Sequence, residues 1–182
     1  MTLLFTYLFV ALFVSFLCSV LEAVLLSSTP SYIETLSKNG DSKTAKKLKD
    51  LKSNIDKPIS SILTLNTFAH TMGAAGVGAQ AQILFGTEWQ ALIAFILTLL
   101  ILYTSEIIPK TIGAIYWKNL LIPSAYLISI MIKITYPLVW FSSFITNYIS
   151  KGKKDEINFS REEVMAVVTM GEKEGSIHSK ES

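Results

Sequence analysis

The fold of this chain depends on the stretch Tyr103-Thr104-Ser105-Glu106-Ile107-Ile108-Pro109-Lys110-Thr111-Ile112-Gly113. It closes a long apolar run with a carboxylate, a proline and a lysine in quick succession. A carboxylate at the end of a hydrophobic helix is costly, and by default it marks a functional site. Pro109 has no N–H to donate to the carbonyl four residues earlier, so in a helix the Ser105 carbonyl stays free beside Glu106. Two hard oxygens side by side at membrane depth favour a small cation.

The composition predicts an all-α integral membrane protein. The chain has 182 residues, and 51% of them are hydrophobic. The apolar residues gather in runs near or beyond the roughly 20 residues that span a bilayer. These runs cover residues 2–26, 59–85, 89–108 and 120–149. No basic residue precedes the first run, so we interpret it as a retained helix rather than a cleaved signal. Cys18 is the only cysteine, which excludes an intrachain disulfide.

We expect a transmembrane domain over residues 1–150, with three transmembrane helices at about 3–28, 58–85 and 89–108. The helical hairpin expected at 30–56 is basic, with seven lysines between Lys38 and Lys57. Such a loop belongs on the cytoplasmic side, which places the N-terminus outside and the C-terminus inside. Nucleic-acid binding is not expected, because stacking aromatic residues are missing from the hairpin.

The fourth apolar run allows two interpretations. Hydropathy alone makes it a fourth crossing, whereas the lysines on both of its flanks place both ends inside. Pro123, Lys133 and Pro137 interrupt the run, and several Trp and Tyr side chains are typical of a membrane interface. We therefore predict a re-entrant or interfacial juxtamembrane helix over 115–150. Residues 151–182 are predicted to form an acidic helical linker, truncated before a further cytoplasmic domain.

Few polar groups interrupt the spans, and Glu106 is the strongest candidate ligand among them. Its structural alternative is to reach the inner interface or to pair with Lys110, four residues on. Ser19 and Glu22 lie one helical turn apart on one face of the first span. Ser19 could instead bond back to its own helix, and Glu22 could reach the headgroups.

The second span carries Asn66 and, four residues on, His70. Asn66 lies at a depth comparable to Ser19 and Glu106 in an antiparallel bundle, and its amide oxygen suits a hard cation. It could also serve only as an interhelical hydrogen-bonding group. His70 is more typical of packing or hydrogen bonding than of a metal ligand. Gly73 and Gly76 allow neighbouring helices to approach closely.

These residues suit Mg²⁺, which prefers oxygen ligands in octahedral geometry and loses water reluctantly. One or two carboxylates neutralise the ion only in part, so binding should be moderate and reversible, as a transporter needs. No zinc motif, nucleophile elbow or phosphate-binding loop is present in the sequence, so an enzyme is not expected.

The chain resembles the transmembrane domain of the CNNM/CorC magnesium-transporter family. The family's Glu-x-x-Pro-Lys-Thr signature resembles the segment from Glu106 to Thr111. Its small-residue Ser-x-x-Glu motif resembles Ser19 to Glu22, and its Asn-Thr pair resembles Asn66-Thr67. The tail after Ser160 is similar to the acidic linker that precedes the family's cytoplasmic CBS-pair domain.

The resemblance implies a homodimer in the plasma (inner) membrane whose protomers each bind a dehydrated Mg²⁺ among three helices. It implies Mg²⁺ export by alternating access, with Na⁺ as a possible counter-ion. Ser19, Asn66, Glu106 and the Ser105 carbonyl become the expected ligands. Supporting or ion-pathway roles fall to Glu22, Thr67, His70 and Lys110, and structural roles to Pro109, Gly73 and Gly76. The alternative function is a non-transporting membrane anchor that senses the ion for a cytoplasmic regulatory domain.

Overall fold

A computed structural model describes residues 1–38 and 42–149, and every element within these ranges is a helix. The elements are α1 (Thr2–Ser27), α2 (Pro30–Lys38), α3 (Ser42–Ser53), α4 (Asp56–Phe85), η1 (Thr87–Trp89), α5 (Gln90–Leu100), η2 (Ile101–Ile107), α6 (Ile108–Ile115) and α7 (Trp117–Ile149). This confirms the all-α class and the helical hairpin. The residues up to Ser143 form one compact unit, and Phe144 begins a second. The expected acidic linker at 151–182 lies outside the described residues.

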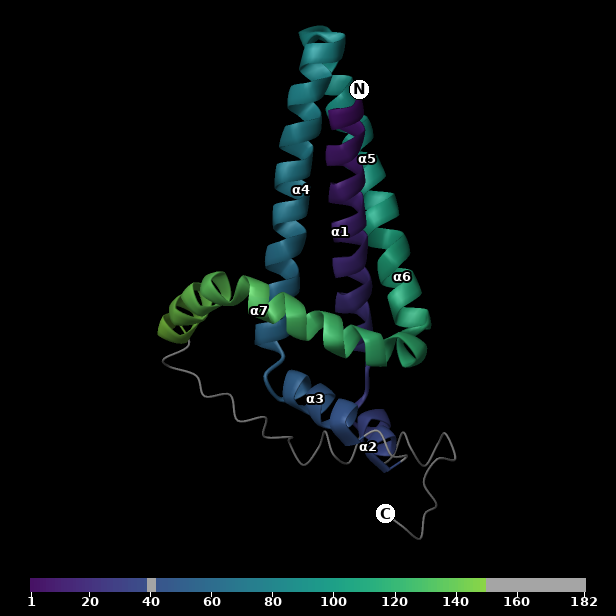
Figure 1. The fold of residues 1–182 in the computed structure, drawn as a ribbon, viewed down its shortest axis with the longest axis vertical. Helices are drawn as coiled ribbons and strands as arrows, with labels where there is room; N and C mark the ends of the chain where they lie inside the picture. Colours follow the sequence, from purple (N-terminus) through teal and green to yellow (C-terminus); the bar gives the residue numbers. More distant parts are fainter. Residues whose placement is uncertain (39–41, 150–182) are drawn as a thin grey trace, which may run out of the picture. The chain divides into compact units, whose positions relative to one another are not determined.

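Three long helical segments lie side by side in the first unit (Figure 1). The central helix α1 packs against α4 on one side and against η2 and α6 on the other. Glycines make these approaches close: a Cβ on Gly73 would overlap the Ala11 side chain, and one on Gly113 would lie 2.7 Å from the Val20 carbonyl oxygen. Small residues at such contacts let backbones pack directly against each other.

The third long segment continues through Pro109 instead of ending near residue 108. It runs from α5 through η2, which is a π-helix, into α6. The Ile108 N–H bonds to the Tyr103 carbonyl, five residues back. The π-helical turn and Pro109, near the start of α6, together change the hydrogen-bonding pattern at this point, and such bulges are frequent at functional sites.

The hydrophobic core lies where the bundle meets the hairpin and α7. Its buried members come from the second half of α1, from α2, α3 and α4, and from one face of α7. The α7 contribution comprises Leu121, Ala125, Ile128 and Met131. We expected Pro123 and Pro137 to interrupt this run, but both lie inside one continuous helix. Each proline removes a single backbone bond, and the packed apolar face offsets that loss.

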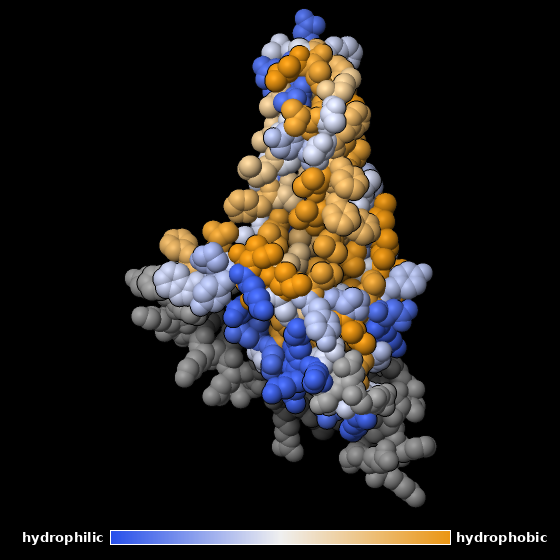
Figure 2. Space-filling model, in the orientation of Figure 1, coloured by the Kyte–Doolittle hydropathy of each residue, from blue (hydrophilic) through white to orange (hydrophobic). Residues whose placement is uncertain are grey.

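The outer part of the bundle presents apolar side chains on its surface. In Figure 2 this apolar surface lies above a lower region that is rich in hydrophilic residues. In the described part, α5 buries none of its residues against other helices. An apolar surface of this extent suits contact with lipid.

By length and composition, three helices within the described ranges could cross a membrane: Thr2–Ser27, Thr87–Ile115 and Trp117–Leu138. Three long apolar helices agree with a helical membrane protein. The set differs from our expected spans, because it includes the start of α7 and omits α4. The sequence of α4 explains the omission, since alanine, glycine and neutral polar residues lower its hydropathy without adding charge after Lys57.

Candidate cation site

A layer of polar contacts connects the three long segments in the interior of the bundle. The Ser15 hydroxyl on α1 lies 2.5 Å from His70 Nε2 on α4. It also lies 3.4 Å from the Ser105 carbonyl oxygen on η2, to which it donates. His70 Nδ1 lies 3.5 Å from a Glu106 carboxylate oxygen. Glu106 therefore faces another helix of the bundle, although about a third of its side chain remains accessible.

The Ser105 carbonyl is the oxygen that the sequence predicted to be free of its helical partner. Pro109 stands four residues on and has no N–H to donate to it. In the structure this carbonyl accepts the Ser15 hydroxyl instead. Ser105 is fully buried, and its own hydroxyl donates to the Ile101 carbonyl at 2.7 Å.

A second polar layer lies closer to the hairpin. Lys110 Nζ on α6 lies 3.2 Å from a Glu22 carboxylate oxygen on α1. The alternative pairing of Lys110 with Glu106 is therefore not what the structure contains. Glu106 lies in the π-helical segment and Lys110 in α6, and each pairs with a residue of another helix.

Two buried oxygens lie between these layers without a hydrogen-bond partner among the described residues: Ser19 Oγ and Asn66 Oδ1. Ser19 lies one turn beyond Ser15 along α1, and Asn66 lies one turn before His70 along α4. Because α1 and α4 run in opposite directions, both steps lead toward the hairpin (Figure 1). The unpaired oxygens thus occupy neighbouring positions at about one level of the bundle.

Unpaired buried polar groups are rare and costly. Each leaves about 1–3 kcal/mol of desolvation uncompensated. A native structure that retains two of them at one level calls for an explanation such as a bound ion or a water molecule. Ser19 Oγ, Asn66 Oδ1, the Ser105 carbonyl and the Glu106 carboxylate together make a set of hard oxygen donors, which Mg²⁺ prefers.

The remaining candidates are spread around this set. Thr67 is exposed on α4, so its side chain lies away from the interior. Pro109 is buried beside the site. A Cβ on Gly76 would lie 2.6 Å from the Tyr7 ring, so Gly76 and Gly73 bring α4 against α1. In the described ranges no three His, Cys, Asp or Glu residues gather as a metal-binding group. The candidate set consists instead of neutral oxygens and one carboxylate.

Sequence reasoning missed Ser15, which is fully buried and contacts both other segments. A signal was available, because Ser15 precedes Ser19 by four residues and therefore shares its helical face. The contact between His70 and Glu106 had no comparable signal, since it depends on how α4 and η2 are rotated about their axes.

The fold defines a helical membrane protein whose three long segments are joined by polar contacts in the interior. The family described as "Cyclin M transmembrane N-terminal domain" (CNNM) matches residues 6–181, and the chain belongs to this family. The resemblance identified from Glu106, Pro109 and Lys110 is thereby confirmed.

The curated relatives extend this result to bacteria. A UPF0053 protein, sll1254, from Synechocystis is 33% identical over 163 residues, covering 90% of this chain and 46% of the relative. A UPF0053 protein from Haemophilus influenzae is 30% identical, covering 81% and 36%. The UPF0053 inner membrane protein YfjD from Escherichia coli is 29% identical, covering 73% and 32%. The chain spans less than half the length of these relatives.

Proposed function

We propose that this chain is the membrane domain of a Mg²⁺ transporter and that Mg²⁺ is its substrate. The observation that carries the proposal is the pair of buried oxygens, Ser19 Oγ and Asn66 Oδ1, that have no hydrogen-bond partner in the described part of the chain and lie one helical turn from the layer of Ser15 and His70. A cation held by these oxygens, the Ser105 carbonyl and the Glu106 carboxylate would compensate their lost hydration. Membership of the CNNM family supports the choice of Mg²⁺ over other small cations.

The chemistry of the site favours release as well as binding. A single carboxylate neutralises half of the charge of Mg²⁺, and neutral oxygens supply the remaining contacts. Glu106 already has a protein partner in His70, at 3.5 Å, to which it can return when the ion leaves. Exchange between these two partners gives a reversible site, as alternating access requires.

We propose that α1, α4 and the segment from α5 to α6 cross the membrane, with the hairpin in the cytoplasm. The sequence of α4 after Lys57 carries no formal charge, and its length matches that of α1. The η1 turn lies at one end of these segments, and its only charged residue is Glu88. The lysines of the hairpin and Lys118 lie at the other end. This distribution of charge favours an η1 turn outside the cell and a hairpin in the cytoplasm.

In this proposal the protein exports Mg²⁺ across the plasma (inner) membrane, with Na⁺ as the counter-ion. The functional unit is a homodimer, and a cytoplasmic CBS-pair domain regulates it. The alternative remains a membrane anchor that senses the ion without transporting it. The relatives are more than twice as long as the matched segment, so they have room for a cytoplasmic domain that either regulates transport or receives the signal of a sensor.

Flux through purified protein in proteoliposomes tests the proposal. Vesicles loaded with a Mg²⁺-sensitive dye should show a Mg²⁺ flux for the wild-type protein. Glu106→Gln keeps the size and polarity of the side chain but removes its charge, and it should abolish most of the flux. Lys43→Gln, an exposed change on α3, is the matched control and should leave the flux intact. An inactive wild-type protein that still binds Mg²⁺ would favour the anchor and sensor.

A further inference from the structure

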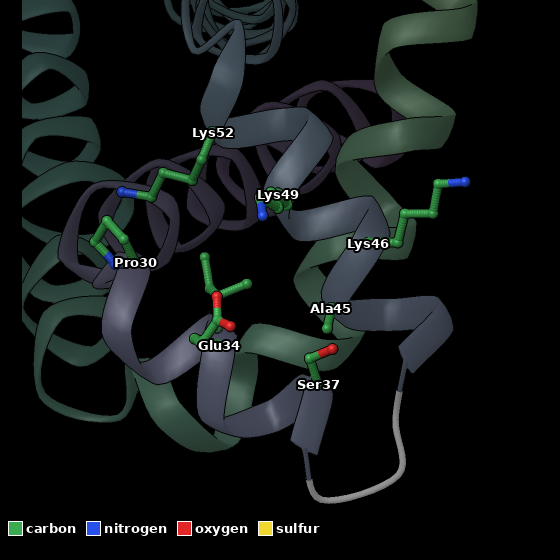
Figure 3. A pocket seen from close by; sticks show the side chains of 8 residues that line it. Pro30, Glu34, Ser37, Ala45, Lys46, Lys49 and Lys52 are labelled. Carbon is green, nitrogen blue, oxygen red and sulfur yellow. The ribbon is translucent and has the colours of Figure 1, made fainter.

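A cavity of about 270 Å³ lies between the two helices of the hairpin. Its lining includes Pro30, Ile33, Glu34 and Ser37 from α2 and Ala45, Lys46, Lys49 and Lys52 from α3. Figure 3 shows Lys52 projecting from α3 toward Pro30, while the Lys46 side chain extends outward. Spacings of three residues place these lysines along one side of α3.

The cavity lysines differ from other lysines at this end of the fold. Lys47 lies over the Tyr126 ring at 4.2 Å, and Lys118 lies 5.7 Å from the Trp117 ring. These cations have π-electron partners. Within the described ranges, Lys46, Lys49 and Lys52 have neither an aromatic partner nor an ion pair.

The charge of the cavity lining is positive and uncompensated. Three lysines against Glu34 leave a formal charge of 3 − 1 = +2. Glu34 makes no ion pair with them in the described part of the chain. Burial lowers the pKa of Lys52 below its usual range, because the charged ammonium loses hydration there. An anion in the cavity would reverse that penalty.

We propose that the cavity between α2 and α3 binds a phosphate group, with Lys46, Lys49 and Lys52 as its cationic side. The phosphate belongs either to an anionic phospholipid or to a soluble molecule. Ammonium groups bind phosphate as mobile point charges, and the flexible stem of Lys46 lets it turn toward the cavity. Clusters of lysine on cytoplasmic segments of membrane proteins attract anionic lipids.

The contacts of the hairpin with α7 indicate that the cavity lies near the lipid headgroups. Tyr32 on α2 packs edge-on against Trp117 of α7, with ring centroids 5.0 Å apart. Lys47 on α3 covers Tyr126 of the same helix. Tryptophan and tyrosine are enriched at the headgroup level of membranes. The hairpin is thus fixed to a helix whose aromatic residues are typical of the interface.

Thermal unfolding of the detergent-purified protein, in Mg²⁺-free buffer, tests the inference. The probes are a short-chain phosphatidylglycerol, a phosphatidylcholine with the same acyl chains, and inorganic phosphate. Binding to the folded state should raise the Tm with phosphatidylglycerol and much less with phosphatidylcholine. A similar rise with inorganic phosphate would assign the site to soluble phosphates, whereas its absence would assign the site to the lipid.

Two sets of variants make the test specific. The triple variant Lys46→Gln, Lys49→Gln and Lys52→Gln should raise the half-saturating concentration about tenfold or more. Lys38→Gln, Lys43→Gln and Lys133→Gln remove the same charge from exposed positions outside the cavity and should have little effect. Glu34→Gln removes the opposing carboxylate and should strengthen binding, which keeps the test available if the triple variant does not fold.

The absence of a Tm rise with both phosphatidylglycerol and inorganic phosphate would overturn the inference. So would equal losses in the two triple variants, since these would indicate diffuse attraction to the basic hairpin. Because Mg²⁺ is absent throughout, neither result depends on the proposed transport site.

Discussion

His70 on α4 and Glu106 on the π-helical turn face each other, with Nδ1 and a carboxylate oxygen 3.5 Å apart. The same imidazole contacts Ser15 through Nε2. One side chain therefore joins all three long segments and holds the carboxylate inside the bundle. In the proposed function, Glu106 exchanges this contact for the ion.

Replacing His70 by alanine should destabilise the ion-free protein. Ser15 and Glu106 would lose a partner, and for the fully buried Ser15 hydroxyl this costs about 1–3 kcal/mol. Added Mg²⁺ should restore more stability to this variant than to the wild type, because Glu106 no longer gives up His70 to bind the ion. Thermal unfolding with and without Mg²⁺ measures both effects. A variant as stable as the wild type without Mg²⁺ would show that the contact contributes little.

Replacing Ser19 by alanine should have the opposite effect on the ion-free protein. The Ser19 hydroxyl is buried and has no partner among the described residues, so its removal relieves a desolvation cost of about 1 kcal/mol or more. The same change removes a proposed ligand and should reduce the stabilisation by Mg²⁺. A higher Tm without Mg²⁺ together with a smaller Tm rise on adding Mg²⁺ is the result expected of a binding residue.

Ser61 provides the matched control on α4. It is also fully buried, but its hydroxyl donates to the Lys57 carbonyl at 2.9 Å. Ser61→Ala should lower stability slightly and leave the response to Mg²⁺ unchanged. If both serine variants behave alike, Ser19 has no special role.

The close packing of α1 against α4 at Gly73 predicts that larger side chains are not tolerated there. Gly73→Val would place side-chain atoms in the space of Ala11, so it should destabilise the bundle by about 1–3 kcal/mol. Gly78→Ala meets no neighbouring atom within 4 Å and should be neutral or stabilising by up to about 1 kcal/mol through helix propensity. Unfolding temperatures of the two variants test the difference. Equal tolerance at both positions would contradict this packing.

The membrane topology is tested by labelling single cysteines in intact cells. The native Cys18 is fully buried, which keeps the background low. An impermeant thiol reagent applied outside should modify Thr87→Cys in the η1 turn. It should not modify Lys43→Cys in the hairpin or a cysteine at Lys153, beyond α7. Reaction at Lys153 would instead show that α7 crosses the membrane as a fourth span.

The helices and the main polar residues could be predicted from sequence because each has a local signal. The hydrophobic runs predicted the α1 and α4 boundaries to within three residues. Pro109 predicted a free Ser105 carbonyl, because the missing N–H is a property of that residue alone. The family motif likewise lies in one short segment around Glu106.

The contacts between helices could not be predicted, because they depend on how each helix is rotated about its axis, and no local sequence pattern determines that rotation. Whether Lys110 pairs with Glu106 or Glu22 depends on how α6 packs against α1, and the π-helical turn before it has no hydropathy signal. The partner of Glu106 depends on how α4 is turned about its axis. Pro123 likewise fits inside α7 where its neighbours Leu121 and Ala125 pack into the core with residues distant in the sequence.

Thermal stability titrated against Mg²⁺ tests the central claim most directly, with Ca²⁺ and Na⁺ as controls and Glu106→Gln beside the wild type. An ion that binds only the folded state raises its stability with concentration by mass action. We predict a saturable rise of Tm with Mg²⁺ in the wild type, larger than with either control, and its loss in Glu106→Gln. A wild type that does not respond, or a Glu106→Gln variant with the same response, would contradict the claim that these oxygens hold the ion.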